Sequence, residues 1–336
     1  MRRLLLTCLL AWVLLGGMLF GTAHANTYGA GFLDLTLTDP VEGGPMQAIV
    51  FYPTQAQNAA TRRGPFTIDA ALHSAPAAGP FPLIVVSHGT GGSLMGHHDS
   101  LTALARAGFV AAAVEHPRDN FRDDSGFATD LQLVGRPHHI VALIDGVLAH
   151  GTTAGIVDRS RIGMAGHSAG GYTALLVAGA KPNFALMAEY RRAVPHDPLQ
   201  ARADAAPRER RRPDLAYVTD QRVRAIFLMA PALGYVLDRA GLAKVEVPVR
   251  LYRPSEDEIL VHPWNAERIA QMLPTPPEYH VLDGAGHFVF LAPCPTALAS
   301  RLAIICTDPP GIDRTAIHVR LNAEMIDFFR RRLVPR

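Results

Sequence analysis

Residues 161–180 read RIGMAGHSAGGYTALLVAGA: a short apolar run, the motif GHSAG at 166–170, and an apolar stretch with helical spacing. The G-x-S-x-G order predicts a sharp turn from a strand into a helix, with Ser168 at the turn. A serine at that place adopts strained backbone angles, and the flanking glycines let neighbouring chains approach closely. The turn exposes the hydroxyl group beside a helix N-terminus, whose N–H groups and dipole favour negative charge.

Short apolar runs that suit buried strands alternate with segments that carry apolar residues at helical spacing. The predicted strands are residues 48–52, 83–87, 110–114, 161–165, 225–229, 247–252 and 279–282. The predicted helices are residues 98–107, 137–149, 169–180, 263–273 and 317–332. This alternation predicts an α/β fold, a mostly parallel sheet with helices on both faces. Ligands of such sheets bind at the carboxyl ends of the strands, where the serine turn lies.

A serine hydroxyl needs a base within hydrogen-bond reach, and the base needs a third group that orients it. In this architecture their order along the chain is serine, acid, histidine. We expect the base to be His287, because it follows the last predicted strand in the flexible sequence GAGHF. Three adjacent carboxylates follow the penultimate strand. Asp257, with its short side chain, is the preferred acid, and Glu256 and Glu258 remain open as alternatives.

An oxyanion formed beside the serine needs two preorganised N–H donors. One is expected from Ala169, the residue after the nucleophile. The other is expected from the loop HGTGG at residues 88–92, which follows a predicted strand. We predict the amide of Thr90, with that of Gly91 as the alternative. A phosphate-binding loop is excluded because no lysine follows a glycine, and a dinucleotide fingerprint fails because Leu94 replaces its third glycine.

A metal site is the alternative use of the histidines in this part of the chain, which are His88, His97, His98 and His116. They fall on different predicted elements, and the sequence contains no H-E-x-x-H motif. A serine mechanism also needs no metal. We therefore predict neither a metal nor a cofactor.

The first 25 residues resemble a signal peptide. Two arginines precede an apolar run at residues 4–20, and AHA at 23–25 fits a cleavage site of small residues. The mature chain is then expected to begin at Asn26 and to be exported to the periplasm or the extracellular space. An uncleaved membrane anchor is the alternative, but this apolar run is short for a span of about 20 residues.

Charge gives no sign of a macromolecular partner. The chain has 32 basic and 30 acidic residues, and the predicted cleavage leaves 30 of each because it removes two arginines. Neither a nucleic-acid-binding surface nor a polybasic membrane patch is indicated.

Two cysteines remain in the mature chain, Cys294 and Cys306. Export to an oxidising compartment predicts a disulfide between them.

Residues 26–336 are predicted to form a single α/β domain with an insertion at about 181–222. The insertion leaves the helix after Ser168 and returns to the strand at 225–229. Its inner part, residues 200–212, is rich in Arg and Ala and lacks large apolar side chains. We expect the whole segment 181–222 to tune substrate choice, and its inner part to be a solvated face that favours short or soluble acyl groups. A surface decoration away from the site is the alternative.

Together these motifs resemble those of the secreted bacterial α/β-hydrolases similar to dienelactone hydrolase and to platelet-activating-factor acetylhydrolase. The resemblance covers roughly residues 47–333 and is carried by HGTGG at 88–92, GHSAGG at 166–171, SEDEI at 255–259 and the tail at 286–318. It implies the α/β-hydrolase fold and hydrolysis of a carboxylic ester through an acyl-serine intermediate, without a cofactor. Ser168 stands where dienelactone hydrolases have cysteine. A serine peptidase or amidase, and a binding protein without turnover, are the alternatives.

Overall fold

The computed structural model of the protein describes residues 28–57, 59–205 and 212–333. The predicted signal peptide, residues 1–25, lies outside these ranges, as do residues 206–211 of the predicted insertion. No helix within the described ranges is long and apolar enough to cross a membrane.

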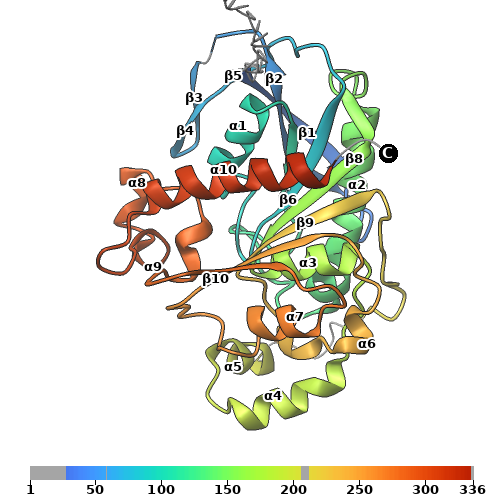
Figure 1. Cartoon of the computed structure of the whole chain (residues 1–336), viewed down its shortest axis with the longest axis vertical. Helices are drawn as coiled ribbons and strands as arrows, with labels where there is room; N and C mark the ends of the chain where they lie inside the picture. Colours follow the sequence, from blue (N-terminus) through green and yellow to red (C-terminus); the bar gives the residue numbers. More distant parts are fainter. Residues whose placement is uncertain (1–27, 58, 206–211, 334–336) are drawn as a thin grey trace, which may run out of the picture.

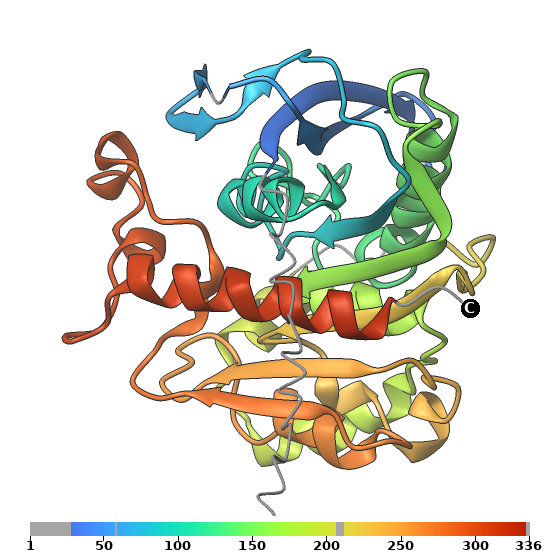
Figure 2. The ribbon, with the colours of Figure 1, turned by 45° about the horizontal axis from the view of Figure 1, so that its top comes forward.

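A large twisted sheet runs through the molecule (Figures 1 and 2). Within the described residues its strands are β1 (Gly29–Thr38), β2 (Pro45–Thr54), β5 (Ala71–Leu72), β6 (Phe81–Ser87), β7 (Val110–Val114), β8 (Val157–His167), β9 (Val223–Met229), β10 (Val249–Pro254) and β11 (Glu278–Leu282). A separate hairpin consists of β3 (Ala60–Arg63) and β4 (Phe66–Asp69).

The order of the strands is β11-β10-β9-β8-β6-β7-β2-β1-β5. Strand β2 is antiparallel to both of its neighbours, and all other pairs in the sheet are parallel. The mostly parallel sheet predicted from the sequence is therefore confirmed. Its central strands β6 and β7 are buried along their whole length, which explains their uninterrupted apolar sequences.

Helices cover both faces of the sheet, as the sequence predicts. The longer ones are α1 (His98–Arg106), α2 (Arg136–Ala149), α3 (Ala169–Val177), α4 (Met187–Ala193), α5 (Pro198–Ala205), α7 (Ala266–Met272) and α10 (Arg314–Arg332). The shorter ones are η1 (Leu131–Gly135), η2 (Phe184–Leu186), η3 (Gly234–Val236), α6 (Arg239–Leu242), η4 (His287–Phe290), α8 (Thr296–Ala299) and α9 (Ala303–Cys306).

Two apolar clusters of buried side chains lie on opposite faces of the sheet. Buried side chains of α1 and α10 pack with one set of strand residues, including Phe227. Those of α2, α3 and α7 pack with the alternate set, including Leu228. Successive residues of β9 thus point to opposite faces, as the pleat of a strand requires. Figure 2 shows β1 and β2 curving over α1 at one end of the sheet.

Strand β1 is not among the predicted strands. Its sequence, GAGFLDLTLT, mixes polar with apolar residues, and exposed residues alternate with more buried ones in its second half, as in a strand with one solvated face. Pairing with β2 over ten residues supplies the backbone hydrogen bonds that fix it. Long-range pairing of this kind leaves a weak local signal in the sequence.

The segment 181–222 contains η2, α4 and α5, which lie at the lower end of the molecule in Figure 1. Tyr190 of α4 is buried and stacks on Tyr235 of η3, with ring centroids 4.0 Å apart. Gln200 of α5 is also buried and donates a hydrogen bond of 2.8 Å to the Tyr235 hydroxyl. The expectation that residues 200–212 form a solvated face is therefore wrong for Gln200, because the neighbouring tyrosines bury it.

Candidate active site

Ser168 occupies the sharp turn between β8 and α3. Its backbone angles are φ 53° and ψ −118°, in a region that L-residues rarely adopt. The two flanking glycines are required sterically. A Cβ at Gly166 would lie 2.1 Å from the backbone oxygen of Gly170, and a Cβ at Gly170 would lie 1.9 Å from the backbone oxygen of Ser87. The local sequence therefore forces the serine into the position that the motif predicts.

His287 and Asp257 are brought together from the loops after β11 and β10. His287 Nδ1 lies 2.9 Å from Asp257 Oδ2, and the two side chains are 2% and 8% exposed. The other carboxylate oxygen, Oδ1, accepts hydrogen bonds from the amides of Ile259 at 3.0 Å and Leu260 at 2.7 Å. These amides fix the carboxylate, which in turn orients the imidazole. The contact with Oδ2 leaves His287 Nε2 available as a proton acceptor.

The two competing carboxylates have other positions. Glu256 is exposed and accepts a hydrogen bond of 3.2 Å from the adjacent Ser255 hydroxyl. Glu258 does not contact the imidazole, but its Oε2 accepts a hydrogen bond of 2.8 Å from the backbone amide of His287. Of the three candidates, Asp257 is thus the one that contacts the ring. Glu258 fixes the backbone of the same histidine, a role that the sequence does not reveal.

Ser168 and His287 both line one cavity. No hydrogen bond joins the hydroxyl to the imidazole in the part of the chain that is described, and such contacts are often long in a ligand-free site. His167, the neighbour of the serine, packs beside His287 with ring centroids 4.8 Å apart. Its Nε2 lies 3.2 Å from the backbone oxygen of His287. Burial, together with the neighbouring histidines, lowers the pKa of His167 well below its usual value.

Thr90 and Ala169 also line the cavity. We call residues 88–92, which follow β6, the oxyanion loop. The backbone amide of Gly91 donates to Asp119 Oδ1 at 3.1 Å, so this N–H is already used. Within the described residues, the amides of Thr90 and Ala169 have no hydrogen-bond acceptor. Of the two amides that the sequence leaves open, the geometry therefore favours Thr90.

The cavity has a volume of about 400 Å³. Segment 181–222 contributes Met187, Tyr190 and Leu199 to its lining. These side chains and several leucines from the sheet loops make the lining mainly apolar. The segment therefore reaches the cavity and is not a remote decoration. Arg202 and Phe127 also line the cavity; the guanidinium group of Arg202 lies 3.9 Å from the ring centroid of Phe127 and pairs with Asp124.

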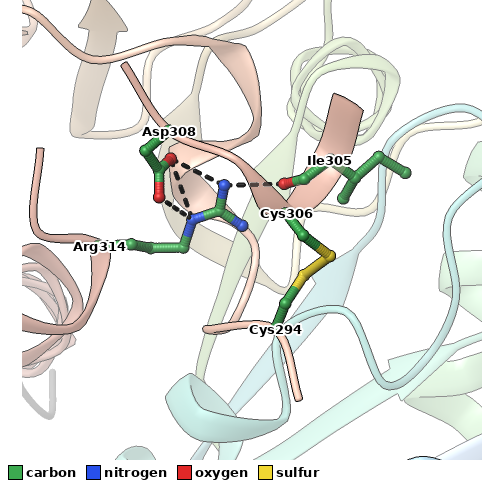
Figure 3. Close-up of a disulfide and its surroundings, with 5 residues drawn as sticks. All are labelled: Cys294, Ile305, Cys306, Asp308 and Arg314. Carbon is green, nitrogen blue, oxygen red and sulfur yellow. Dashed lines mark hydrogen bonds and ion pairs between the residues drawn. A yellow bond between two sulfur atoms is a disulfide. The ribbon is translucent and has the colours of Figure 1, made fainter. Parts of the chain in front are cut away.

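Cys294 and Cys306 form a disulfide, with Cα atoms 5.5 Å apart (Figure 3). The adjacent Ile305 lines the cavity. Arg314 at the start of α10 donates to the backbone oxygen of Ile305 at 2.8 Å and to Asp308 Oδ1 at 2.8 Å. The disulfide and Arg314 together hold the closed loop so that one of its side chains borders the serine cavity.

The histidines considered for a metal are mostly buried. Burial lowers the pKa of His88 to about 3 and that of His97 to about 4, and it lowers the pKa of His116 well below its usual value. His116 also donates its backbone amide to His88 Nε2 at 3.1 Å. No group of three or more His, Cys, Asp or Glu side chains is placed to hold a metal ion within the described residues.

Three comparisons with known proteins were made. Residues 54–133, which include the oxyanion loop, match the family described as platelet-activating factor acetylhydrolase, isoform II. No curated protein matches the chain. A ferulic acid esterase from Streptomyces cinnamoneus has a similar structure, with a TM-score of 0.61, 19% sequence identity, and coverage of 93% of this chain and 92% of that one. The fold is that of the α/β-hydrolases, and the partial family match supports a carboxylic ester hydrolase.

Proposed function

We propose that the protein is a serine carboxylic ester hydrolase in which Ser168 is the nucleophile, His287 the base and Asp257 the acid that orients it. The proposal rests on one observation: a serine forced to positive φ at a strand-to-helix turn shares a cavity with a histidine whose Nδ1 is held by a buried carboxylate. This arrangement of nucleophile, base and orienting acid is the one that activates a serine hydroxyl.

In the first half of the reaction, His287 Nε2 accepts the proton of Ser168 as Oγ attacks the ester carbonyl carbon. The imidazolium that forms is stabilised by Asp257, and it then protonates the leaving alkoxide as the carbon–oxygen bond breaks. An acyl-serine and a free alcohol result. In the second half, His287 takes a proton from water, the resulting hydroxide attacks the acyl carbon, and the proton returns to Ser168 as the carboxylic acid leaves.

The negative charge of each tetrahedral intermediate is assigned to the amides of Thr90 and Ala169. Ala169 is the first residue of α3, so the positive end of the helix dipole adds to its N–H. Both amides border the cavity that contains the nucleophile. Losing one such donor typically costs about 3 kcal/mol of transition-state stabilisation.

The substrate is proposed to be a small, uncharged ester with a short acyl chain. A volume of about 400 Å³ is near the lower limit of small-molecule sites. The mainly apolar lining favours an acyl group without charge, and Met187 and Leu199 limit its length from the side of segment 181–222. The predicted leader at residues 1–25 places this activity outside the cytoplasm, as part of the same proposal.

The substitution Ser168→Ala tests the proposal. We expect covalent labelling by a phosphonate ester and hydrolysis of nitrophenyl acetate to be lost, with a fall in kcat on the order of 10⁶. Ser160→Ala is the matched control, because Ser160 lies on the same strand but is exposed. Undiminished labelling of the Ser168 variant would refute the assignment.

The same assay separates the alternatives. Nitrophenyl acetate, butyrate and octanoate are compared with the corresponding nitroanilides. Faster turnover of the anilides would identify an amidase, and labelling without turnover of any substrate would identify a binding protein. A preference for octanoate would contradict the proposed acyl length.

A further inference from the structure

A fully buried ion pair lies behind the oxyanion loop. Asp119, in the loop after β7, and Arg136, the first residue of α2, are each 1% exposed, and Arg136 Nη1 lies 2.6 Å from Asp119 Oδ2. Removing two charges from water is costly, and a buried pair is retained only where further hydrogen bonds satisfy both partners. The further bonds of this pair therefore indicate what it does.

The further bonds of Asp119 lead to the oxyanion loop. Oδ1 accepts the backbone amide of Gly91 at 3.1 Å, and Oδ2 also accepts Gln132 Nε2 at 2.9 Å. The same Gln132 nitrogen lies 2.8 Å from Thr90 Oγ1. One carboxylate thus holds Gly91 directly and Thr90 through a single amide side chain.

The further bonds of Arg136 hold the start of the same loop. Nη2 donates to the backbone oxygen of His88 and, at 3.1 Å, to Ser87 Oγ. Arg136 therefore fixes the residue that enters the loop, while Asp119 fixes the residues at its tip. The pair therefore contacts the oxyanion loop at its first residue and at Gly91.

A chain of buried groups fixes the direction of the bonds around Arg136. Ser87 Oγ lies 2.9 Å from His116 Nε2, His116 Nδ1 lies 3.1 Å from His139 Nδ1, and His139 Nε2 lies 3.1 Å from Asp39 Oδ1. Burial lowers the pKa of both histidines, so each is neutral and donates from one nitrogen only. Because Asp39 accepts, every donor in the chain points from Arg136 towards Asp39. Arg136 is therefore held from both sides.

We propose that Asp119 is a positioning residue for the oxyanion hole, and that it acts by occupying the Gly91 amide and leaving the Thr90 amide directed at the oxyanion. The inference rests on the proposed function of the site. Asp119 does not line the cavity itself. Its contribution is to orient a donor, so it affects the tetrahedral intermediate and not the binding of the ester.

The test is the substitution Asp119→Asn, with active sites counted by exhaustive phosphonate titration. We expect kcat for nitrophenyl acetate to fall by a factor of about 10² to 10³ and KM to change by less than about twofold. A trifluoromethyl ketone, which forms a tetrahedral adduct with the serine, should lose affinity by a similar factor. The unreactive methyl ketone should bind as before.

Glu278→Gln is the matched control, because it removes a partner of Arg250 at the amino ends of β10 and β11, away from the site. Its kcat per active site should equal that of the unmodified protein. The inference would be overturned if Asp119→Asn kept the kcat of the unmodified protein and the same ratio of affinities for the trifluoromethyl ketone and the methyl ketone. This holds whatever the loss in melting temperature. Absence of phosphonate labelling in the unmodified protein would refute the proposed function instead.

A second variant decides the matter if Asp119→Asn does not fold. Gln132→Met keeps the ion pair and removes the contact with Thr90 Oγ1, together with the hydrogen bonds of the Gln132 side chain to Asp119 Oδ2 and from the Ala128 amide. We expect kcat and the affinity for the trifluoromethyl ketone to fall together by about tenfold, the value of one hydrogen bond. Unchanged values of both would overturn the inference.

Discussion

Mild acid should destabilise this protein strongly, because burial lowers the pKa of several histidines. Four of them, His88, His97, His116 and His167, are at most 2% exposed and have the largest reductions in pKa. Burial lowers the pKa of His88 to about 3 and of His97 to about 4, and lowers those of the other two well below 6.5. In the unfolded chain all four have a pKa of about 6.5.

The sign of the effect follows from the protons bound in each state. Below a pH of about 6.5 the unfolded chain binds protons that the folded protein does not accept, so stability falls as the pH falls. Each histidine contributes about 1.4 kcal/mol between pH 7.5 and 5.5, or about 5 kcal/mol for the four. That loss is comparable with the total stability of many domains, about 5–15 kcal/mol.

The Asp99 carboxylate does not offset this loss. Although burial raises the pKa of Asp99, the hydrogen bond and charge of His318 outweigh it and hold that pKa at about 2. The stability that this group provides is present above the ordinary value of 3.8 and is lost only below it. The change in the free energy of unfolding between pH 7.5 and 5.5 is therefore assigned to the histidines and not to Asp99.

Urea unfolding at the two pH values measures the effect. Trp264 provides the signal, because the other tryptophan, Trp12, lies in the predicted leader. We expect His97→Gln to reduce the pH-dependent difference by about 1.4 kcal/mol, since it removes one titrating group. His196→Gln is the control, because His196 is exposed and should leave the difference unchanged. Equal stability of the unmodified protein at both pH values would refute the reasoning.

Three further predictions concern the site and the disulfide beside it. Asp257→Asn should lower kcat by a factor of roughly 10⁴, because asparagine favours the wrong tautomer of the base, whereas Glu256→Gln should change little; steady-state kinetics that showed the reverse would exchange their roles. Replacing Cys294 and Cys306 by serine should cost about 3 kcal/mol in urea unfolding, since the bond closes a short loop; equal unfolding midpoints would contradict this. Gly170→Ala should abolish turnover and cost about 1–3 kcal/mol, because the added Cβ would lie 1.9 Å from a backbone oxygen at the end of β6; an active, equally stable variant would show that the turn is not sterically tight.

The parts of the site that sequence reasoning could predict depend on short-range chemistry. The turn at Ser168 is specified by glycines two positions away on each side, and the structure shows why each is needed. His287 and Asp257 follow strands whose apolar sequences are easily recognised, so their meeting at one edge of the sheet could be expected. The sequence does not distinguish the amide of Thr90 from that of Gly91 as the oxyanion donor, because the difference depends on the position of Asp119, a distant carboxylate that binds the Gly91 amide.

Other residues could not be predicted because their roles arise from long-range packing. Asp119 and Arg136 belong to no motif, and only the folded chain brings them behind the oxyanion loop. Gln200 lies in a polar sequence and is nevertheless buried, and its side chain donates a hydrogen bond to Tyr235 from a separate segment. Glu258 resembles a solvated loop charge in the sequence, yet it binds the backbone of the base.

The turn at Ser168 touches the oxyanion loop so closely that no side chain fits between them. The proposed nucleophile and the proposed oxyanion donors therefore follow adjoining strands in the middle of the sheet and have little freedom to vary separately. Met187 and Ile305, by contrast, reach the cavity from segments that lie outside the sheet. The turn at Ser168 and the oxyanion loop are thus fixed by backbone contact, whereas the segments that carry Met187 and Ile305 are replaceable. New substrate preferences can arise by exchange of those outer segments alone, with the chemical steps inherited unchanged.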